Sequence, residues 1–321
     1  MKESKSMRDL FLSKVQDKGG FVCHHAHFDK AYLISPETLE KSQRSLREKW
    51  DLYRELKEGY THSDLYSRMC RGVEAMVSQG VTKCRTFIDA DGIVGTAPME
   101  VALEVKNHYR AKGFDLQLAV QPLEGVLEAE PRRAFVEACE MADVVGGLPD
   151  RDRDPEAHMD FIFSLAKRLG KPVDVHVGQN NIPSERESHM VVNKVIRHGL
   201  EGQVNLVHAI SLACQDTYRR SSTIRKIKDT NTGVIVCPSA AISMKQKTHI
   251  YAPIHNSIAP VRELVDAGVD VMLGVDNIHD LFMPLVDGDL WFECRLMMEA
   301  IRCYDLDLVA KIASNTKGFQ I

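Results

Sequence analysis

The sequence of 321 residues has no excess of basic residues, no long apolar run and, in residues 1–20, no uninterrupted apolar core such as a signal peptide has, and each absence narrows the range of expected functions. With 41 Lys and Arg against 45 Asp and Glu, the net charge is -4, so the chain offers no basic face for nucleic acid. No segment has about eighteen apolar residues in a row, and charges interrupt the apolar positions of residues 1–20. We therefore expect a cytoplasmic protein whose partner is a small molecule or a protein, and neither nucleic acid nor a membrane.

The eight cysteines form no C-x-x-C pair and are spread along the whole chain. This distribution argues against a disulfide framework and against a zinc knuckle, and it predicts buried free thiols. Linkers, repeats and low-complexity segments are also missing, so we expect residues 1–321 to form a single domain. The sequence leaves open whether that domain forms a homo-oligomer.

One pattern recurs along the chain: an amphipathic segment, a glycine, and then a short apolar run that ends in polar residues. Pro98 opens one such helix, which runs to Gly113, and Asp154 and Pro155 open another, which ends at Gly170. Eight apolar runs are strand candidates: "GFVCHHAH", "VTKCRTFID", "LQLAVQP", "VVGGLP", "PVDVHVG", "VNLVHAI", "GVIVCPSA" and "VDVMLGVDN".

Eight strands that alternate with helices suit an α/β fold, either a (β/α)₈ TIM barrel or a doubly wound open sheet. Polar residues decide between them, because they stand at the carboxyl ends of strands that are far apart in the sequence: His27, Asp89, His176, His208 and Asp276. Side chains from strands one, five, six and eight meet most easily across a closed barrel, so we predict the barrel. The charged segment 40–64 is most simply a solvated helix and loop after strand one.

The first strand ends in three histidines within four positions. Because side chains alternate across a strand, His25 and His27 share one face and His24 points to the other, where a structural role is the simpler interpretation. A His-x-His pair alone does not establish a metal site, since hydrogen-bonded histidines are common. The hypothesis gains strength because His176, His208 and Asp276 also end apolar runs, and imidazole with carboxylate is a ligand set for zinc and related metals.

The sequence resembles the amidohydrolase superfamily, and within it the cytosine-deaminase-like branch, over nearly the whole chain. The matching motifs are "HAHFDK", "CRTFIDAD", "DVHVGQ", "VNLVHA" and "LGVDN", in this order and spacing. The resemblance implies that His25, His27, His176 and Asp276 bind the metal, and that His208 orients or deprotonates the attacking water. Members with two metals usually bridge them through a modified lysine, and "VVGGLPD" offers none, so we expect one divalent ion, zinc first, with iron or manganese as alternatives.

The implied chemistry is coherent, because a divalent metal lowers the pKa of its water from about 16 to about 7. Asp276 would be a ligand and also the base that carries the water's proton to the leaving nitrogen, and His208 would stabilise the anionic intermediate or share that proton. Without the rest of the set, a capped loop for Asp276 and a buried hydrogen-bonded histidine for His208 are the simpler interpretations.

Two positions depart from the branch. Gln179 stands where cytosine deaminases carry a proton-transferring glutamate, and an amide cannot give up a proton near pH 7. Asn277 replaces a second aspartate that touches the substrate amine in those enzymes. Together with Gln121 and Lys30, these two residues are our candidates for substrate contact, although Lys30 also fits a surface loop.

We therefore expect a hydrolase that cleaves a C–N bond of a small cyclic nitrogen compound, in its sharpest form a deaminase. The alternatives are an amidase or N-alkylamino hydrolase of the same superfamily, and a barrel that retains the metal without turnover. Arg85 and Asp89 share a face of strand two and are expected to pair with each other. The β-sandwich that flanks the barrel in many relatives is not expected here.

Overall fold

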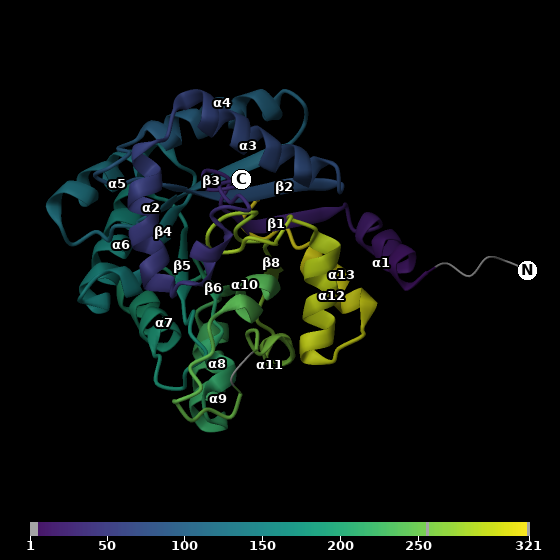
Figure 1. Cartoon of the computed structure of the whole chain (residues 1–321). Helices are drawn as coiled ribbons and strands as arrows, with labels where there is room; N and C mark the ends of the chain where they lie inside the picture. The colour runs from purple at the N-terminus through teal and green to yellow at the C-terminus, as the bar shows by residue number, and fades with distance from the viewer. Residues whose placement is uncertain (1–5, 255–256, 320–321) are drawn as a thin grey trace, which may run out of the picture.

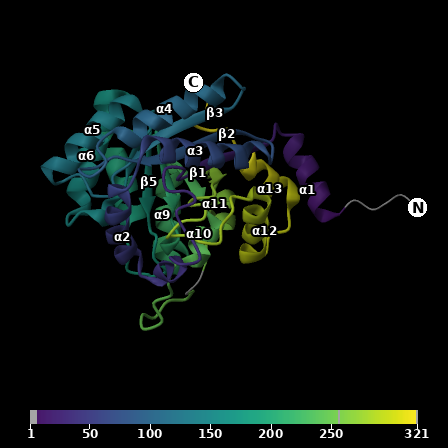
Figure 2. The same cartoon turned by 45° about the horizontal axis from the view of Figure 1, so that its top comes forward.

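The computed structural model describes residues 6–254 and 257–319, and its centre is a ring of parallel strands surrounded by helices (Figure 1). The strands are β1 Phe21–Ala26, β2 Val81–Asp89, β3 Asp115–Gln121, β4 Val145–Gly147, β5 Val173–Val177, β6 Val204–His208, β7 Gly233–Val236 and β8 Val271–Leu273. All eight named strands of the described residues belong to this ring. The view from a second direction shows the helices packed around its outside (Figure 2).

The ring closes at two joins. Hydrogen-bonded ladders link β1, β2 and β3 in one sheet and β4 through β8 in another. A bridge between Ala119 and Val144 joins β3 to the β4 segment, and a bridge between Ala26 and Asp276 joins β1 to the residues just after β8. Every step of the ring is parallel, so the predicted (β/α)₈ barrel is confirmed and the open sheet is wrong.

Helices follow the strands at the places where the sequence has caps and breakers. The main helices are α1 Met7–Gln16, α2 Leu46–Glu58, α3 His62–Val77, α4 Ala97–Arg110, α5 Ala129–Met141, α6 Pro155–Leu169, α7 Glu187–His198, α9 Thr217–Asp229, α12 Leu290–Ile301 and α13 Leu306–Ala313; η1 Leu39–Gln43, η2 Pro149–Arg151, α8 Ser211–Cys214, α10 Pro238–Ser243 and α11 Val261–Asp266 are shorter. Asp154 caps α6 by accepting from the Ala157 N–H, and Gly170 ends it in the left-handed conformation.

The first and last helices lie side by side at one flank of the barrel (Figure 1). Lys14 on α1 donates to the Asp307 carboxylate on α13 at 2.8 Å, and Phe11 packs against Trp291 on α12 with ring centroids 5.3 Å apart. His24 is fully buried, its Nε2 lies 2.6 Å from the Asn315 carbonyl oxygen, and its ring centroid is 5.1 Å from that of Phe319. A register shift between Cys23 and Ala26 interrupts the alternation of β1 on which the predicted orientation of His24 depends. The structural interpretation of His24 therefore agrees with its surroundings.

The expected pairing of Arg85 with Asp89 is wrong. Four residues of a strand span about 13 Å, so these side chains share a face but lie at opposite ends of it. Arg85 is fully buried near the amino ends of the strands and donates to Asp174 at 2.6 Å and to Gln117 at 2.7 Å. Its third partner is the Gly318 carbonyl at 3.0 Å, so the last described residues close this end of the barrel.

The structure bears on two expectations drawn from the composition, the free cysteines and the absence of a membrane-spanning segment. All eight cysteines are free thiols, and each is buried except the half-buried Cys70, as expected. Within residues 6–254 and 257–319, no helix combines the length and apolarity needed to span a membrane. The cytoplasmic location stays a prediction.

The buried Arg85–Asp174 pair yields a stability test. Arg85→Met leaves the Asp174 carboxylate in an apolar interior without a cation, so we expect the free energy of unfolding to fall by about 3–5 kcal/mol. Lys83→Met, on the same strand, removes a partly exposed pair with Asp115 and should cost less than about 1 kcal/mol. Urea unfolding of both variants measures the difference; equal midpoints would contradict the role assigned to Arg85.

Candidate metal centre

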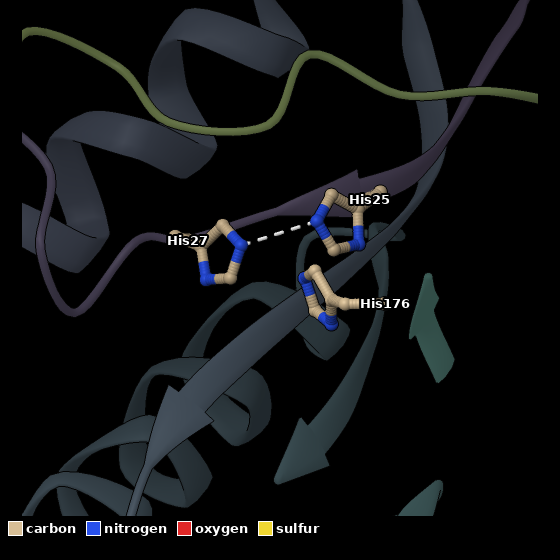
Figure 3. A group of neighbouring side chains, drawn as sticks. All are labelled: His25, His27 and His176. Carbon is tan, nitrogen blue, oxygen red and sulfur yellow. Dashed lines mark hydrogen bonds between the residues drawn. The ribbon is translucent and has the colours of Figure 1, made fainter. Parts of the chain in front are cut away.

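Four imidazoles and one carboxylate meet inside the carboxyl end of the barrel. His25 lies on β1 and His27 just beyond it, and His176 reaches the same place from β5, as Figure 3 shows. His208 ends β6 and Asp276 follows β8. All five are at least 95% buried, so the structure brings together the whole set that the sequence predicted around the metal.

The spacing of these atoms fits the shared coordination of one ion. The Nε2 atoms of His25 and His27 lie 3.1 Å apart, and Asp276 Oδ1 lies 3.2 Å from the first and 3.1 Å from the second. Two nitrogens that bind one tetrahedral zinc at about 2.0–2.1 Å are roughly 3.3 Å apart. The three ligand atoms thus have the mutual spacing of three corners of a coordination polyhedron.

Unpartnered nitrogens point to the same conclusion. Neither ring nitrogen of the buried His176 has a hydrogen-bond partner, and its ring centroid is 4.8 Å from that of His25. Buried polar atoms without partners are costly unless a ligand or water satisfies them. The ligand atoms of His25, His27 and His176 lie within 4.8 Å of one another, and so do those of His25, His208 and Asp276.

The backbone is strained where two of these side chains turn inward. His208 has φ +72° and Asp276 has φ +64°, in the left-handed region that residues other than glycine rarely adopt. Such conformations persist only where the surrounding structure holds them, and they cluster at functional sites. Asp276 is held by the N–H that it donates to the His25 carbonyl at 3.0 Å.

Burial and the carboxylate set the charges of the cluster. Burial lowers the pKa of His25, His27 and His176, and it lowers the pKa of His208 to about 4. Burial alone would raise the pKa of Asp276, but hydrogen bonds from His25 and His27 hold it well below its usual value. The cluster therefore consists of neutral imidazoles around an ionised carboxylate, which is the protonation state that a divalent cation requires.

A cavity of about 1040 Å³ opens above the cluster. His27, His176, His208 and Asp276 line its floor, and Gln121 and Gln179 line it higher up. Both glutamines are buried, and Gln121 Oε1 and Gln179 Nε2 have no hydrogen-bond partner. The two amides thus offer an acceptor and a donor to a bound molecule.

Lys30 and Asn277 also reach this cavity, but each already has a protein partner. The Lys30 ammonium is 99% buried and donates to Asp89 at 2.6 Å, so the surface-loop interpretation is wrong. Asn277 donates to Asp280 at 2.6 Å, and burial raises the pKa of that carboxyl to about 6. Any contact of these two residues with substrate would add to an existing network.

The segment after strand one was misjudged from its charges. Only one face of α2 is solvated; Trp50, Tyr53 and Lys57 on the other face are buried. Lys57 forms ion pairs with Asp89 at 2.8 Å and Asp91 at 2.5 Å, which fasten the helix to the barrel beside Lys30. The spacing of these buried positions, three and four residues apart, is the sequence signal that predicts an amphipathic helix rather than a solvated one.

Two half-buried acids in the segment that follows Gln179 were also missed. Glu187 accepts from the Gly178 N–H at 2.7 Å, and Glu185 accepts from the Asn180 N–H at 3.1 Å. Both line the cavity, and burial raises the pKa of Glu185 to about 7 and that of Glu187 to about 8. Nothing in the local sequence distinguishes them from solvated helix-start glutamates.

The fold and this cluster define a barrel enzyme with a candidate metal centre at the carboxyl ends of its strands. The family model described as "Amidohydrolase family" matches residues 19–315. The chain belongs to the amidohydrolase family, and the predicted enzyme class, a hydrolase of non-peptide C–N bonds, is confirmed.

Individual relatives agree with this assignment. An uncharacterized protein of Haemophilus influenzae is 36% identical over 267 residues, which are 81% of this chain and 96% of that protein. The N-isopropylammelide isopropyl amidohydrolase of Pseudomonas sp. (strain ADP) is 26% identical over 285 residues, which are 84% of this chain and 65% of that enzyme. The crystal structure of 5-methylcytosine deaminase from Klebsiella pneumoniae with 5-fluorocytosine matches with a TM-score of 0.84 and 26% identity, over 93% of this chain and 74% of that one.

The ion pairs of Lys57 predict how firmly α2 is held. Lys57→Met leaves Asp91 without its cation, so we expect the local opening free energy of α2 to fall by roughly 3 kcal/mol. Hydrogen exchange of the amides of residues 46–58 measures this opening. Arg54→Met, on the exposed face of the same helix, is the matched control and should change it by less than about 1 kcal/mol. Unchanged exchange in Lys57→Met would show that α2 is held by its apolar contacts alone.

Proposed function

We propose that the protein is a metal-dependent aminohydrolase that removes an amino group from a small nitrogen heterocycle. The observation that carries this proposal is the convergence of His25, His27 and Asp276, whose ligand atoms lie 3.1 to 3.2 Å apart at the floor of the cavity. Membership of the amidohydrolase family and the similarity to a deaminase and an ammelide hydrolase support the same class of reaction.

The proposed ligands of the metal are His25, His27, His176 and Asp276. Three imidazoles and a carboxylate suit zinc, with iron and manganese as alternatives. When bound, the ion supplies a water of lowered pKa and a Lewis acid. One ion is the better fit, because β4 consists of Val145, Gly146 and Gly147 and presents no lysine that could bridge a second.

Asp276 and His208 then move the proton. Asp276 is the base that takes a proton from the attacking water and delivers it to the nitrogen that leaves. The C–O bond forms first and gives a tetrahedral carbon; the C–N bond then breaks, and the amine departs with that proton. His208 Nε2 lies 3.9 Å from Asp276 Oδ2, close enough to the carboxylate to hydrogen-bond the developing anion or to share the proton.

Gln121 and Gln179 position the substrate ring. Their unpartnered buried atoms, an acceptor and a donor, complement a ring edge that presents an N–H beside a carbonyl or ring nitrogen. Such an edge is found on pyrimidines, triazines and pterins. A ring without it leaves both amides unsatisfied, which costs binding energy. Lys30 and Asn277 support this wall of the cavity from their ion pair and hydrogen bond.

A second reaction is favoured by one residue. Gln179 cannot supply a proton to a ring nitrogen, so hydrolysis of an N-alkylamino substituent, whose leaving amine takes its proton from Asp276, is the alternative. The 26% identity to an isopropyl amidohydrolase supports this reading. A barrel that holds metal without turnover is the third outcome.

Metal analysis and product detection separate these outcomes. Protein purified without added metal is assayed for bound ions, and then for ammonia release across pyrimidines, triazines, pterins and amides. Ammonia that disappears with a chelator and returns with zinc supports the deaminase. An alkylamine or a carboxylate as product supports the alternative, and bound metal with no product on any compound would refute turnover.

The role of His208 yields a quantitative prediction. His208→Asn replaces the imidazole with an amide, which can hydrogen-bond but cannot exchange a proton. We therefore expect most of the metal to stay bound and the rate to fall by roughly two to four decades. Metal content and kcat are measured on the same preparation. His176→Asn is the matched control, expected to lose metal. Comparable metal loss in both variants would make His208 a ligand.

The identity of residue 179 yields the second prediction. Gln179→Glu places a carboxyl, which can transfer a proton, beside the ring, so we expect the variant to gain deaminase activity on cytosine-like rings. The measurement is ammonia release from cytosine by Gln179→Glu and by the wild type, with Asn180→Asp as the neighbouring control. An unchanged substrate profile would mean that the surrounding loops set specificity.

A further inference from the structure

The mouth of the cavity is lined by cationic side chains, which we call the cationic rim: Arg44, Arg47, Lys49, Lys245 and Lys247. They come from two segments that are far apart in the sequence, η1 with the start of α2 and the loop after α10. Each is exposed or half-buried, whereas the imidazole cluster on the floor is buried. A chain with a net charge of -4 thus concentrates positive charge at the entrance to its candidate active site.

Two of these cations already have carboxylate partners, and three do not. Arg47 pairs with Asp150 at 2.7 Å, and Arg44 lies 3.8 Å from Glu48. In the described part of the chain, no carboxylate forms an ion pair with the three lysines of the rim. Lys49 donates only to a backbone carbonyl, that of Phe282, at 3.2 Å. These ammonium groups keep donors available for a ligand.

The acids of the cavity do not cancel this charge. Besides Asp150 and Asp276, Glu185 and Glu187 line it. Burial raises their pKa values to about 7 and about 8, so at pH 7 Glu185 is about half protonated and Glu187 is mostly protonated. An anion that binds near them meets less repulsion than two ionised carboxylates would exert.

The size of the cavity indicates that the substrate extends to this rim. A volume of about 1040 Å³ is at the upper end of the range for drug-sized ligands, and a single six-membered ring fills only a small part of it. A ring held at Gln121 and Gln179 on the buried wall would leave the mouth open to a second part of the same molecule.

We propose that the substrate is a nitrogen heterocycle that carries an oxyanion, a carboxylate or a phosphate, and that Lys49, Lys245 and Lys247 bind this group at the mouth of the cavity. The proposal rests on the proposed function for the position of the ring and adds the class of substituent. Charge-assisted hydrogen bonds from several ammonium groups give such a substituent both affinity and orientation. They also attract the ligand over a distance of about a Debye length.

Binding of matched ring compounds tests the proposal without turnover. The carboxylate arm compares uracil with its 6-carboxylate, and the phosphate arm compares cytidine with its 5′-phosphate. Trp50 lines the cavity and reports binding by its fluorescence, in a Trp291→Phe background that removes the other tryptophan, remote on α12. We expect at least one charged member to bind about tenfold or more tightly than its uncharged partner, and this preference to weaken as salt is added.

Charge removal at the rim supplies the second measurement. The variant Lys49→Gln/Lys245→Gln/Lys247→Gln should bring the charged and uncharged members to within about twofold of each other. Lys18→Gln, outside the cavity, is the control and should keep the full preference. Equal affinity of both members for the unmodified protein, absence of binding by both charged members, or a preference that survives the triple variant would each overturn the proposal.

The outcome is distinguishable from that of the proposed function. A charge preference at the rim together with no product from any charged or uncharged ring would keep the oxyanion site and refute the hydrolase. Turnover of uncharged rings without any charge preference would keep the hydrolase and refute the oxyanion site.

Discussion

The join between the last and the first strand is the contact on which the candidate site depends. The N–H groups of Val275 and Asp276 both donate to the His25 carbonyl, at 2.9 and 3.0 Å. Gly274 permits this approach, because a Cβ at that position would lie 2.5 Å from the Cβ of His25. The same join that closes the barrel therefore sets the Asp276 carboxylate against the imidazoles of the first strand, and the local backbone bears a positive φ to keep it there.

Polar networks at both ends of the barrel hold the strands around that join. At the amino end, Arg85 and Asp174 are both fully buried and tie β2 to β5. At the carboxyl end, Lys30 and Lys57 share Asp89, which fastens both the loop after β1 and α2 to β2. Since buried pairs are strongly destabilised when one partner is removed, these networks favour one arrangement of the strand ends over others.

The sequence predicted what depends on periodicity and position, and missed what depends on side-chain reach. Apolar runs and glycines in the sequence mark the strand ends that carry His176, His208 and Asp276. In a closed barrel these ends face one another, so the sequence predicts that the three side chains meet. The pairing of cations with carboxylates depends on distances across strands and loops, and the sequence patterns do not give these distances. For that reason Asp89 was assigned to Arg85, although Lys30 and Lys57 hold it. The many charged residues around α2 likewise led to the prediction of a solvated helix, although one of its faces is buried.

A single divalent ion held by residues from three strands is the central claim. Anomalous diffraction at the zinc edge, from crystals of the protein grown with zinc, tests it most directly. The account predicts one peak about 2.0–2.2 Å from the ligand atoms of His25, His27, His176 and Asp276. Zinc bound elsewhere, or an ordered cluster of these side chains that stays without a peak at saturating zinc, would contradict it.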